Sequence, residues 1–192
     1  MLNWFEFCRV FLSKVRRAQS ESRRLLLILR GCQVGKRALI GPELELVGKP
    51  ECIVLGRSVV LEKGVKLTVS NLCSARSALS IGDETFIGRF TTITARENVF
   101  IGRKVLIAPF CYISETNHGI EKGTAIQDQP SPWKNIIIND GVWIGNGCTI
   151  LPGVTIGEGA VIGANSVVNS DIPPEAIAVG CPARVVKYRT SR

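Results

Sequence analysis

The segment INDGVWIGNGCTILPGVTIGEGAVIGANSVV, which runs from Ile138 to Val168, repeats one six-residue pattern without interruption. An aliphatic residue opens each repeat, and glycine usually follows it. A period of six does not match the 3.6-residue turn of an α-helix, but it matches the two-residue alternation of side chains along a β-strand. The segment therefore predicts a series of short strands, each of which directs an aliphatic side chain inward.

The same spacing extends upstream, and it is interrupted only after a third repeat. The upstream repeats open at Val34, Ile40, Leu46, Leu55, Leu61, Leu67, Ile81, Ile87, Ile93, Ile101, Ile107 and Ile113. The insertions follow the repeats that open at Leu46, Leu67, Ile93 and Ile113. Three strands per coil, with loops at one corner only, indicate an all-β solenoid whose stacked coils share one core. We predict a parallel β-helix of about six coils, roughly from Cys32 to Pro173.

The residue four positions after each opening residue has the same parity and should also point inward. It is small or β-branched at nearly every repeat: Val59, Val65, Thr85, Thr91, Val105, Cys111, Val142, Cys148, Val154, Ala160 and Ser166. Each predicted coil would bury this inner face only by stacking on its neighbours.

The length and the charge balance limit the possible classes of protein. The chain has 192 residues, which fits one domain with small appendages, and 24 Lys plus Arg against 16 Asp plus Glu. A basic excess favours an acidic partner, such as a phosphorylated cofactor or a membrane surface, or it serves only solubility. We expect no nucleic-acid partner, because the aromatic residues are few and are not interleaved with a basic stripe.

The seven cysteines are dispersed and include no C-x-x-C pair. This pattern favours reduced thiols over a disulfide framework or a zinc knuckle. No stretch approaches the ~20 apolar residues that span a bilayer. The N-terminus does not resemble a signal peptide either, because charged residues interrupt its apolar residues. We therefore expect a cytoplasmic protein.

Both ends of the chain differ from the repeats. Residues 1–31 are predicted to form a basic amphipathic helix with a stripe at Trp4, Cys8, Phe11 and Val15. This segment either caps the open end of the solenoid or lies on the inner face of an anionic membrane as a peripheral contact. Both interpretations are compatible if only Leu25–Leu29 dock on the coils. Residues 32–173 form the β-helix, and residues 174–192 form a basic extension with a short helix.

The chain contains a single histidine, His118, in the run ISETNHGIEKG. His118 ends the repeat that opens at Ile113, and the longest insertion, from Gly119 to about Ile137, follows it directly. A histidine at the base of a protruding loop is well placed to act as a general base, because free imidazole has a pKa of about 6.5 and is partly neutral at cellular pH.

Three features together resemble the hexapeptide-repeat acyltransferases: His118 before a long loop, the phrase VWIGNGCTILPGVTIGEGAVIGANSVV, and DIPPEAIAVGCPARVVK after it. The similarity is strongest to bacterial sugar O-acetyltransferases, including those that modify surface polysaccharide, and it covers about residues 32–189. The resemblance implies a left-handed β-helix, a homotrimer with active sites between subunits, and acetyl-CoA as the acyl donor with no metal.

The resemblance also implies roles for individual residues. His118 would deprotonate an acceptor hydroxyl, and the backbone N–H of Asn146 would stabilise the oxyanion. Glu115, Glu121 or a main-chain carbonyl would orient the imidazole, while Asn117 and Glu115 are the predicted acceptor-binding residues. The predicted coenzyme-binding residues are Trp143, Gly145, Gly163, Ala164, Arg184 and Lys187.

One departure from the family pattern bears on the acceptor. Galactoside-type enzymes carry an acceptor-side asparagine, and the equivalent stretch here, residues 88–91, has none. This favours a polysaccharide or lipid-linked glycan over a small disaccharide. We predict a sugar O-acetyltransferase; the alternatives are an N-acetyltransferase for an amino sugar and a non-catalytic structural β-helix. A zinc-dependent carbonic anhydrase of this fold needs three histidines and is excluded by their number.

Overall fold

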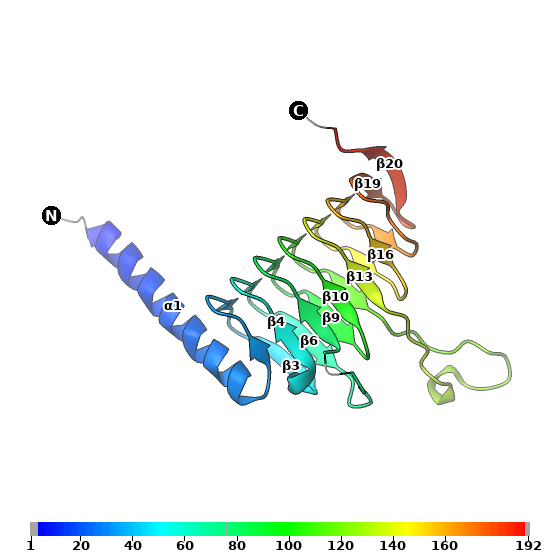
Figure 1. Cartoon of the computed structure of the whole chain (residues 1–192), viewed down its shortest axis with the longest axis horizontal. Coiled ribbons are helices and arrows are strands. Elements are labelled where there is room, and N and C mark those ends of the chain that lie inside the picture. The colour runs from blue at the N-terminus through cyan, green and yellow to red at the C-terminus, as the bar shows by residue number, and fades with distance from the viewer. Residues whose placement is uncertain (1–3, 76, 191–192) are drawn as a thin grey trace.

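A left-handed parallel β-helix with a triangular section forms most of the molecule, and a long helix, α1 (Trp4–Leu29), precedes it (Figure 1). The computed structural model describes residues 4–75 and 77–190, with the side chains of residues 4–14 and 16 left out. Three of the four residues of the stripe predicted at Trp4, Cys8, Phe11 and Val15 therefore lie outside the described side chains; Val15 is half-buried.

Each side of the triangle is one sheet. Sheet A contains β1 (Gln33–Val34), β4 (Ile53–Leu55), β7 (Leu79–Ile81), β10 (Val99–Ile101), β13 (Ile136–Ile138) and β16 (Thr155–Ile156). Sheet B contains β2 (Leu39–Ile40), β5 (Val60–Leu61), β8 (Phe86–Ile87), β11 (Leu106–Ile107), β14 (Trp143–Ile144), β17 (Val161–Ile162), β19 (Ala176–Val179) and β20 (Arg184–Tyr188). Sheet C contains β3 (Glu45–Gly48), β6 (Lys66–Val69), β9 (Thr92–Ala95), β12 (Tyr112–Ser114), β15 (Thr149–Ile150) and β18 (Val167–Val168). The prediction of six coils is confirmed.

The register between coils is regular, so like residues stack on like residues. In sheet B, Ile107 pairs with Ile87 in the coil before and with Ile144 in the coil after. The eleven positions predicted to face inward, from Val59 to Ser166, are at most 2% exposed. Thr85, which is buried among them, donates its hydroxyl to the Gly102 carbonyl at 2.7 Å, and this bond satisfies the polar group. The predicted core is confirmed.

All four insertions lie at the corner between sheet C and sheet A, as the spacing predicted. The first contains the short 3₁₀ helix η1 (Pro50–Cys52), and the last contains η2 (Ile126–Asp128). The last insertion, residues 115–135, extends away from the coils as an arm (Figure 1). Loops are tolerated here because each strand pairs with the neighbouring coil and not with the strand that follows it in the chain.

The second half of α1 packs against the first coil and satisfies the edge strand β2. The Ile40 N–H donates to the Ser20 hydroxyl at 2.7 Å, and the Arg23 guanidinium donates to the Ile40 carbonyl at 3.1 Å. These two bonds occupy backbone groups that an open sheet edge would leave unpaired. Of the segment Leu25–Leu29, only Leu27 is buried. Among the described residues, none of the helices has the length and apolar character needed to cross a membrane.

The C-terminal segment corrects the prediction, because it contains strands where a short helix was expected. β19 pairs in parallel with β17 and adds part of a seventh coil, and β20 folds back antiparallel on β19. The physical reason is that Ile172, Ala176 and Ala178 keep the inward alternation and are buried. The repeat therefore continues beyond Pro173, and the two prolines occupy a corner.

Candidate active site

The arm that carries His118 begins as a two-stranded ribbon. Thr116 and Trp133 form an antiparallel bridge, and the Asn117 N–H donates to the Pro132 carbonyl at 2.9 Å. The Gly119 N–H donates to the Pro130 carbonyl at 3.1 Å. The base of the arm is thus held by backbone hydrogen bonds on both sides of His118.

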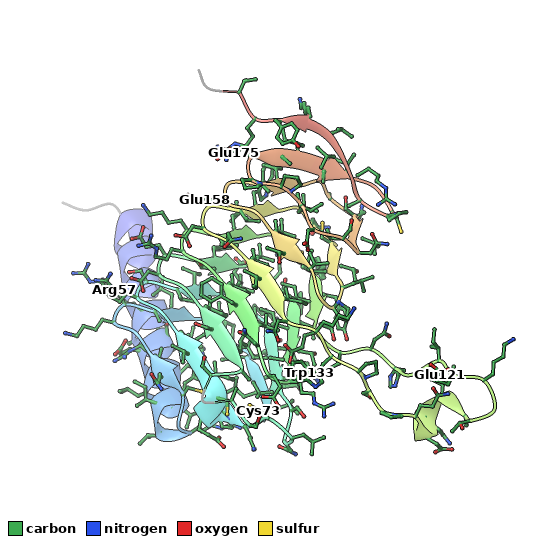
Figure 2. The ribbon with its side chains drawn as sticks, turned by 45° about the vertical axis from the view of Figure 1, so that its right-hand side comes forward. Arg57, Cys73, Glu121, Trp133, Glu158 and Glu175 are labelled. Carbon is green, nitrogen blue, oxygen red and sulfur yellow. The ribbon has the colours of Figure 1, made fainter. Side chains whose placement is uncertain are left out.

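His118 itself is exposed at this base. Its backbone N–H donates to the Asn117 side-chain oxygen at 2.9 Å, whereas its imidazole forms no hydrogen bond with any described residue. Glu121, predicted as one possible partner, is exposed farther along the arm (Figure 2). The ring is therefore accessible to an acceptor or to another molecule.

Gln129 orders the outer part of the arm. Its side-chain amide donates to the carbonyls of Glu121 at 2.9 Å and Thr124 at 2.8 Å, and its oxygen accepts the Glu121 N–H at 2.8 Å. The arm nevertheless exposes Ile120 (82%) and Ile126 (57%) to solvent. Apolar side chains on a well-bonded, projecting arm indicate a contact with another surface.

The structure buries Glu115, which was predicted to bind the acceptor or to orient the imidazole. The side chain is 0% exposed, and its carboxylate accepts the backbone N–H groups of Arg96 and Glu97 and that of Asn98, the last at 2.9 Å. The preceding insertion turns its donors toward this carboxylate, and the buried carboxylate is not accessible from solvent. Glu115 is two positions after the inward residue Ile113, and this parity was the signal for an inward side chain.

The predicted oxyanion donor lies at a different corner, between sheets B and C. An added Cβ on Gly145 would lie 2.6 Å from the Ala164 nitrogen of the next coil, so this position excludes any side chain. The Asn146 carbonyl accepts the Asn165 N–H at 2.8 Å, but among the described residues no acceptor faces the Asn146 N–H. That N–H is therefore available to a developing negative charge.

The predicted coenzyme residues gather on the outer face of sheet B. Trp143 pairs with Val161, Val161 with Ile177, and Ile177 with Lys187, so these four residues form one row across four strands. Trp143 is 50% exposed, and Lys187 lies about 14 Å away if neighbouring strands are ~4.8 Å apart. An extended ligand with an anionic end fits a face with an aromatic at one side and a cation at the other.

The remaining coenzyme positions flank this row. Arg184 pairs with Val179 on the same outer side as Lys187, and it is exposed. Gly163 lies under Val179, whose Cγ1 would be 2.6 Å from an added Cβ, and Ala164 is exposed at the same corner as Asn146. The structure thus brings the predicted coenzyme residues and Asn146 to one surface.

One chain does not bring His118 and Asn146 together. His118 follows sheet C, whereas Asn146 precedes it, so the width of sheet C separates the two corners. One side of the triangle corresponds to one six-residue repeat, which at ~3.3 Å per residue spans roughly 15–20 Å. Proton transfer needs heavy atoms about 3 Å apart, so His118 and Asn146 of a single chain are too far apart to act on one reacting group.

Two further features of the surface were not predicted. The outward residues of sheet B are apolar in every coil: Leu39, Val60, Phe86, Leu106, Trp143, Val161 and Ile177. Each precedes an inward residue, where alternation favours a polar side chain on a solvated face, and this was the signal in the sequence. At the corner beside this face, the rings of Phe90 and Phe110 stack with centroids 5.5 Å apart.

Comparison with known proteins agrees with this fold. A family model described as the bacterial transferase hexapeptide (six repeats) matches residues 135–170. The chain therefore carries the hexapeptide repeat of bacterial transferases. This confirms the resemblance that the motifs indicated.

Three curated proteins are similar in sequence. A probable acetyltransferase of Mycobacterium tuberculosis is 35% identical over 151 residues, covering 78% of this chain and 49% of that protein. A putative lipopolysaccharide biosynthesis O-acetyl transferase of Escherichia coli is 34% identical, covering 58% and 61%. The galactoside O-acetyltransferase of Escherichia coli is 40% identical, covering 60% and 57%. The chain thus matches about half to three fifths of the length of these relatives.

A solved structure shows the same fold over most of the chain. The N-acyltransferase AntD from Bacillus cereus, crystallised with dTDP and 3-hydroxybutyryl-CoA, superimposes with a TM-score of 0.75 at 23% identity. The match covers 90% of this chain and 88% of AntD.

Proposed function

We propose that the protein is an acetyl-CoA-dependent O-acetyltransferase that acts on a hydroxyl group of a sugar. The observation that carries the proposal is the row from Trp143 to Lys187, which leads at its corner to the unpaired N–H of Asn146. An aromatic beside the pantetheine arm, and cations beside the phosphates, are contacts that a coenzyme A thioester would use.

The transfer needs one proton acceptor and one oxyanion donor. His118 takes the proton of the sugar hydroxyl, and the oxygen then forms its bond to the thioester carbonyl carbon. The Asn146 N–H donates to the oxyanion of the tetrahedral intermediate. When the C–S bond breaks, the imidazolium of His118 returns its proton to the thiolate, and the products are the O-acetyl sugar and CoA. General-base catalysis of this kind contributes about 10²- to 10⁴-fold.

Completion of the site requires a neighbouring copy of the chain, and we infer a homotrimer. His118 of one copy would meet the Asn146 corner of the next. Two observations support this arrangement: the apolar outer residues of sheet B that precede Trp143, from Leu39 to Leu106, and the exposed Ile120 and Ile126 on the arm. Apolar surface of both kinds is removed from water when copies pack side by side.

The acceptor in this proposal is a glycan of a surface polysaccharide or its lipid-linked precursor. The relative named as a putative lipopolysaccharide biosynthesis O-acetyl transferase supports this class, and so does the lack of an acceptor-side asparagine at residues 88–91. N-acetylation of an amino sugar is the alternative that the experiment must separate.

Binding of the donor can be tested before the acceptor is known. Titration calorimetry with acetyl-CoA compares the wild type with His118→Ala and with Arg184→Ala/Lys187→Ala. The matched control is Lys36→Ala/Arg37→Ala, which removes two exposed cations at the other end of the solenoid. We expect His118→Ala and the control to retain the wild-type Kd within about twofold, and the Arg184/Lys187 variant to weaken it about tenfold or more, as two charge-assisted contacts imply.

Turnover is then measured as thiol release with methyl glycosides of neutral sugars and of glucosamine. We expect O-acetylation of at least one neutral glycoside, with a 10²- to 10⁴-fold loss in His118→Ala. Product on the glucosamine nitrogen alone would instead identify an N-acetyltransferase. If the folded wild type binds no acetyl-CoA, the enzyme proposal is overturned in favour of a structural β-helix.

A further inference from the structure

Helix α1 presents two opposite faces at its C-terminal end. Ser20, Arg23 and Leu27 contact the first coil, and Leu27 is only 5% exposed. Leu25 and Leu29 each lie two positions from Leu27, which is about 200° around the helix. They therefore point away from the coils, and they are 50% and 84% exposed.

These leucines belong to a larger apolar surface. Leu26 is 56% exposed and Ile28 is 40% exposed, so four neighbouring aliphatic side chains of α1 face solvent. In the sequence, the spacing of three and four residues that joins Leu29, Leu25, Ser22 and Ala18 continues the predicted stripe. Clustered exposed aliphatic side chains mark an interaction surface, whereas single ones are ordinary.

Most of the exposed charges around this surface are positive, although Glu51 lies beside Gly31 at the end of α1. Arg17 and Arg30 on α1 are exposed, and so are Lys36 and Arg37 in the turn between β1 and β2. On the coil-facing side of α1, a groove of about 1320 Å³ toward β2 and β5 is lined by Arg17, Arg23, Arg24, Lys36 and Arg37, of which Arg23 and Arg24 are already hydrogen-bonded within the chain. Glu21 is the single acidic residue among the described residues of its lining, and it pairs with Arg24 at 2.6 Å.

The position of α1 makes this surface accessible to a flat partner. The helix crosses the open end of the solenoid, and its N-terminal half extends past the first coil (Figures 1 and 2). The exposed leucines therefore lie on the end of the molecule, on the side opposite the sheet edge that α1 covers. A helix with this arrangement of leucines and arginines can lie in the plane of a lipid headgroup layer.

We propose that the C-terminal half of α1 binds an anionic lipid bilayer, and that this contact holds the β-helix at a membrane surface. Leu25, Leu26, Ile28 and Leu29 enter the boundary of the acyl chains, and the arginines contact lipid phosphates. A second copy of this chain fits the surface less well, because symmetric packing of α1 on α1 brings rows of arginines together. The proposal is independent of the acetyl-transfer reaction.

The test is sedimentation of the full chain with vesicles of phosphatidylcholine alone or mixed with phosphatidylglycerol at three to one. Leu25→Gln/Leu29→Gln removes the apolar contact and keeps helix propensity. The matched control, Leu72→Gln/Val186→Gln, changes two side chains that are 70% and 58% exposed elsewhere. Arg17→Gln/Arg30→Gln removes two of the cations.

We expect the wild type and the control to bind the anionic vesicles, and the leucine variant to lose binding at least tenfold. The arginine variant and 500 mM salt should both weaken binding, because the attraction to phosphatidylglycerol is electrostatic. The proposal is overturned if the wild type stays in the supernatant with anionic vesicles. It is also overturned if the leucine variant binds as well as the control, or if it alters the oligomeric state without lipid.

Discussion

Glu115→Gln tests whether this carboxylate supports the fold or acts on the acceptor. Three backbone N–H groups converge on it, and the glutamine NH₂ would face one of these donors in place of an oxygen. An orphaned buried donor costs ~1–3 kcal/mol, and loss of the charge weakens the other two bonds. We expect a loss of about 3 kcal/mol, which lowers the Tm of a chain of this size by about 6 to 12 °C.

The assay is thermal unfolding at one fixed protein concentration, because assembly would otherwise shift Tm. Glu121→Gln, an exposed glutamate on the same arm, is the control and should change stability by no more than about 0.5 kcal/mol. A Glu115→Gln protein that melts with the wild type but fails to transfer acetyl groups would refute the structural role. That result would indicate that Glu115 takes part in acceptor binding or catalysis.

Three further changes test other contacts. Gly145→Ala places a Cβ 2.6 Å from the Ala164 nitrogen, and we expect a loss of about 1–3 kcal/mol in thermal unfolding; an unchanged Tm would show that the corner can open. Ser20→Ala leaves the Ile40 N–H unpaired beneath α1, so the stability of the first coil should fall by about 1–3 kcal/mol. Hydrogen exchange of the Ile40 amide should then be faster, and an unaltered rate would contradict the hydrogen bond to Ser20. Leu106→Arg puts a charge on the apolar row of sheet B, and light scattering should then report a smaller assembly than for the wild type; an intact trimer would place the interface elsewhere.

The sequence predicts the coils well because one physical rule operates at every repeat. Inward residues recur with strict parity from Ile40 to Val168, and register follows from that parity. The C-terminal part was mispredicted because Pro173 and Pro174 were taken as the end of the repeat, although they occupy a corner where no N–H donor is needed. Local signals of this kind do not show whether a ladder continues beyond them.

The candidate site was harder to predict, because its parts are remote in the sequence and lie at different corners. The row that contains Trp143 and Lys187 depends on β20 folding back on β19. The six-residue pattern does not predict this antiparallel return. Proximity to His118 in the sequence favours a role for Glu115 at the site, whereas strand parity predicts the buried side chain that the structure has. The proposed contact with a second copy of the chain has only an indirect signal in the sequence, the apolar outward residues such as Leu106.

The arm adds little to the entropic cost of closing the coil from which it projects. Tyr112 and Thr149, the pair that closes across it, are about twice as far apart in the sequence as Thr149 and Val167 in the next coil. Doubling a loop adds only about 0.6 kcal/mol to its closure. Loop closure alone therefore sets little limit on the length of the arm beyond Glu115, whereas residues 96–98 and Glu115 at its base are bonded to one another. The outer part of the arm can therefore change in length while the coils keep their register.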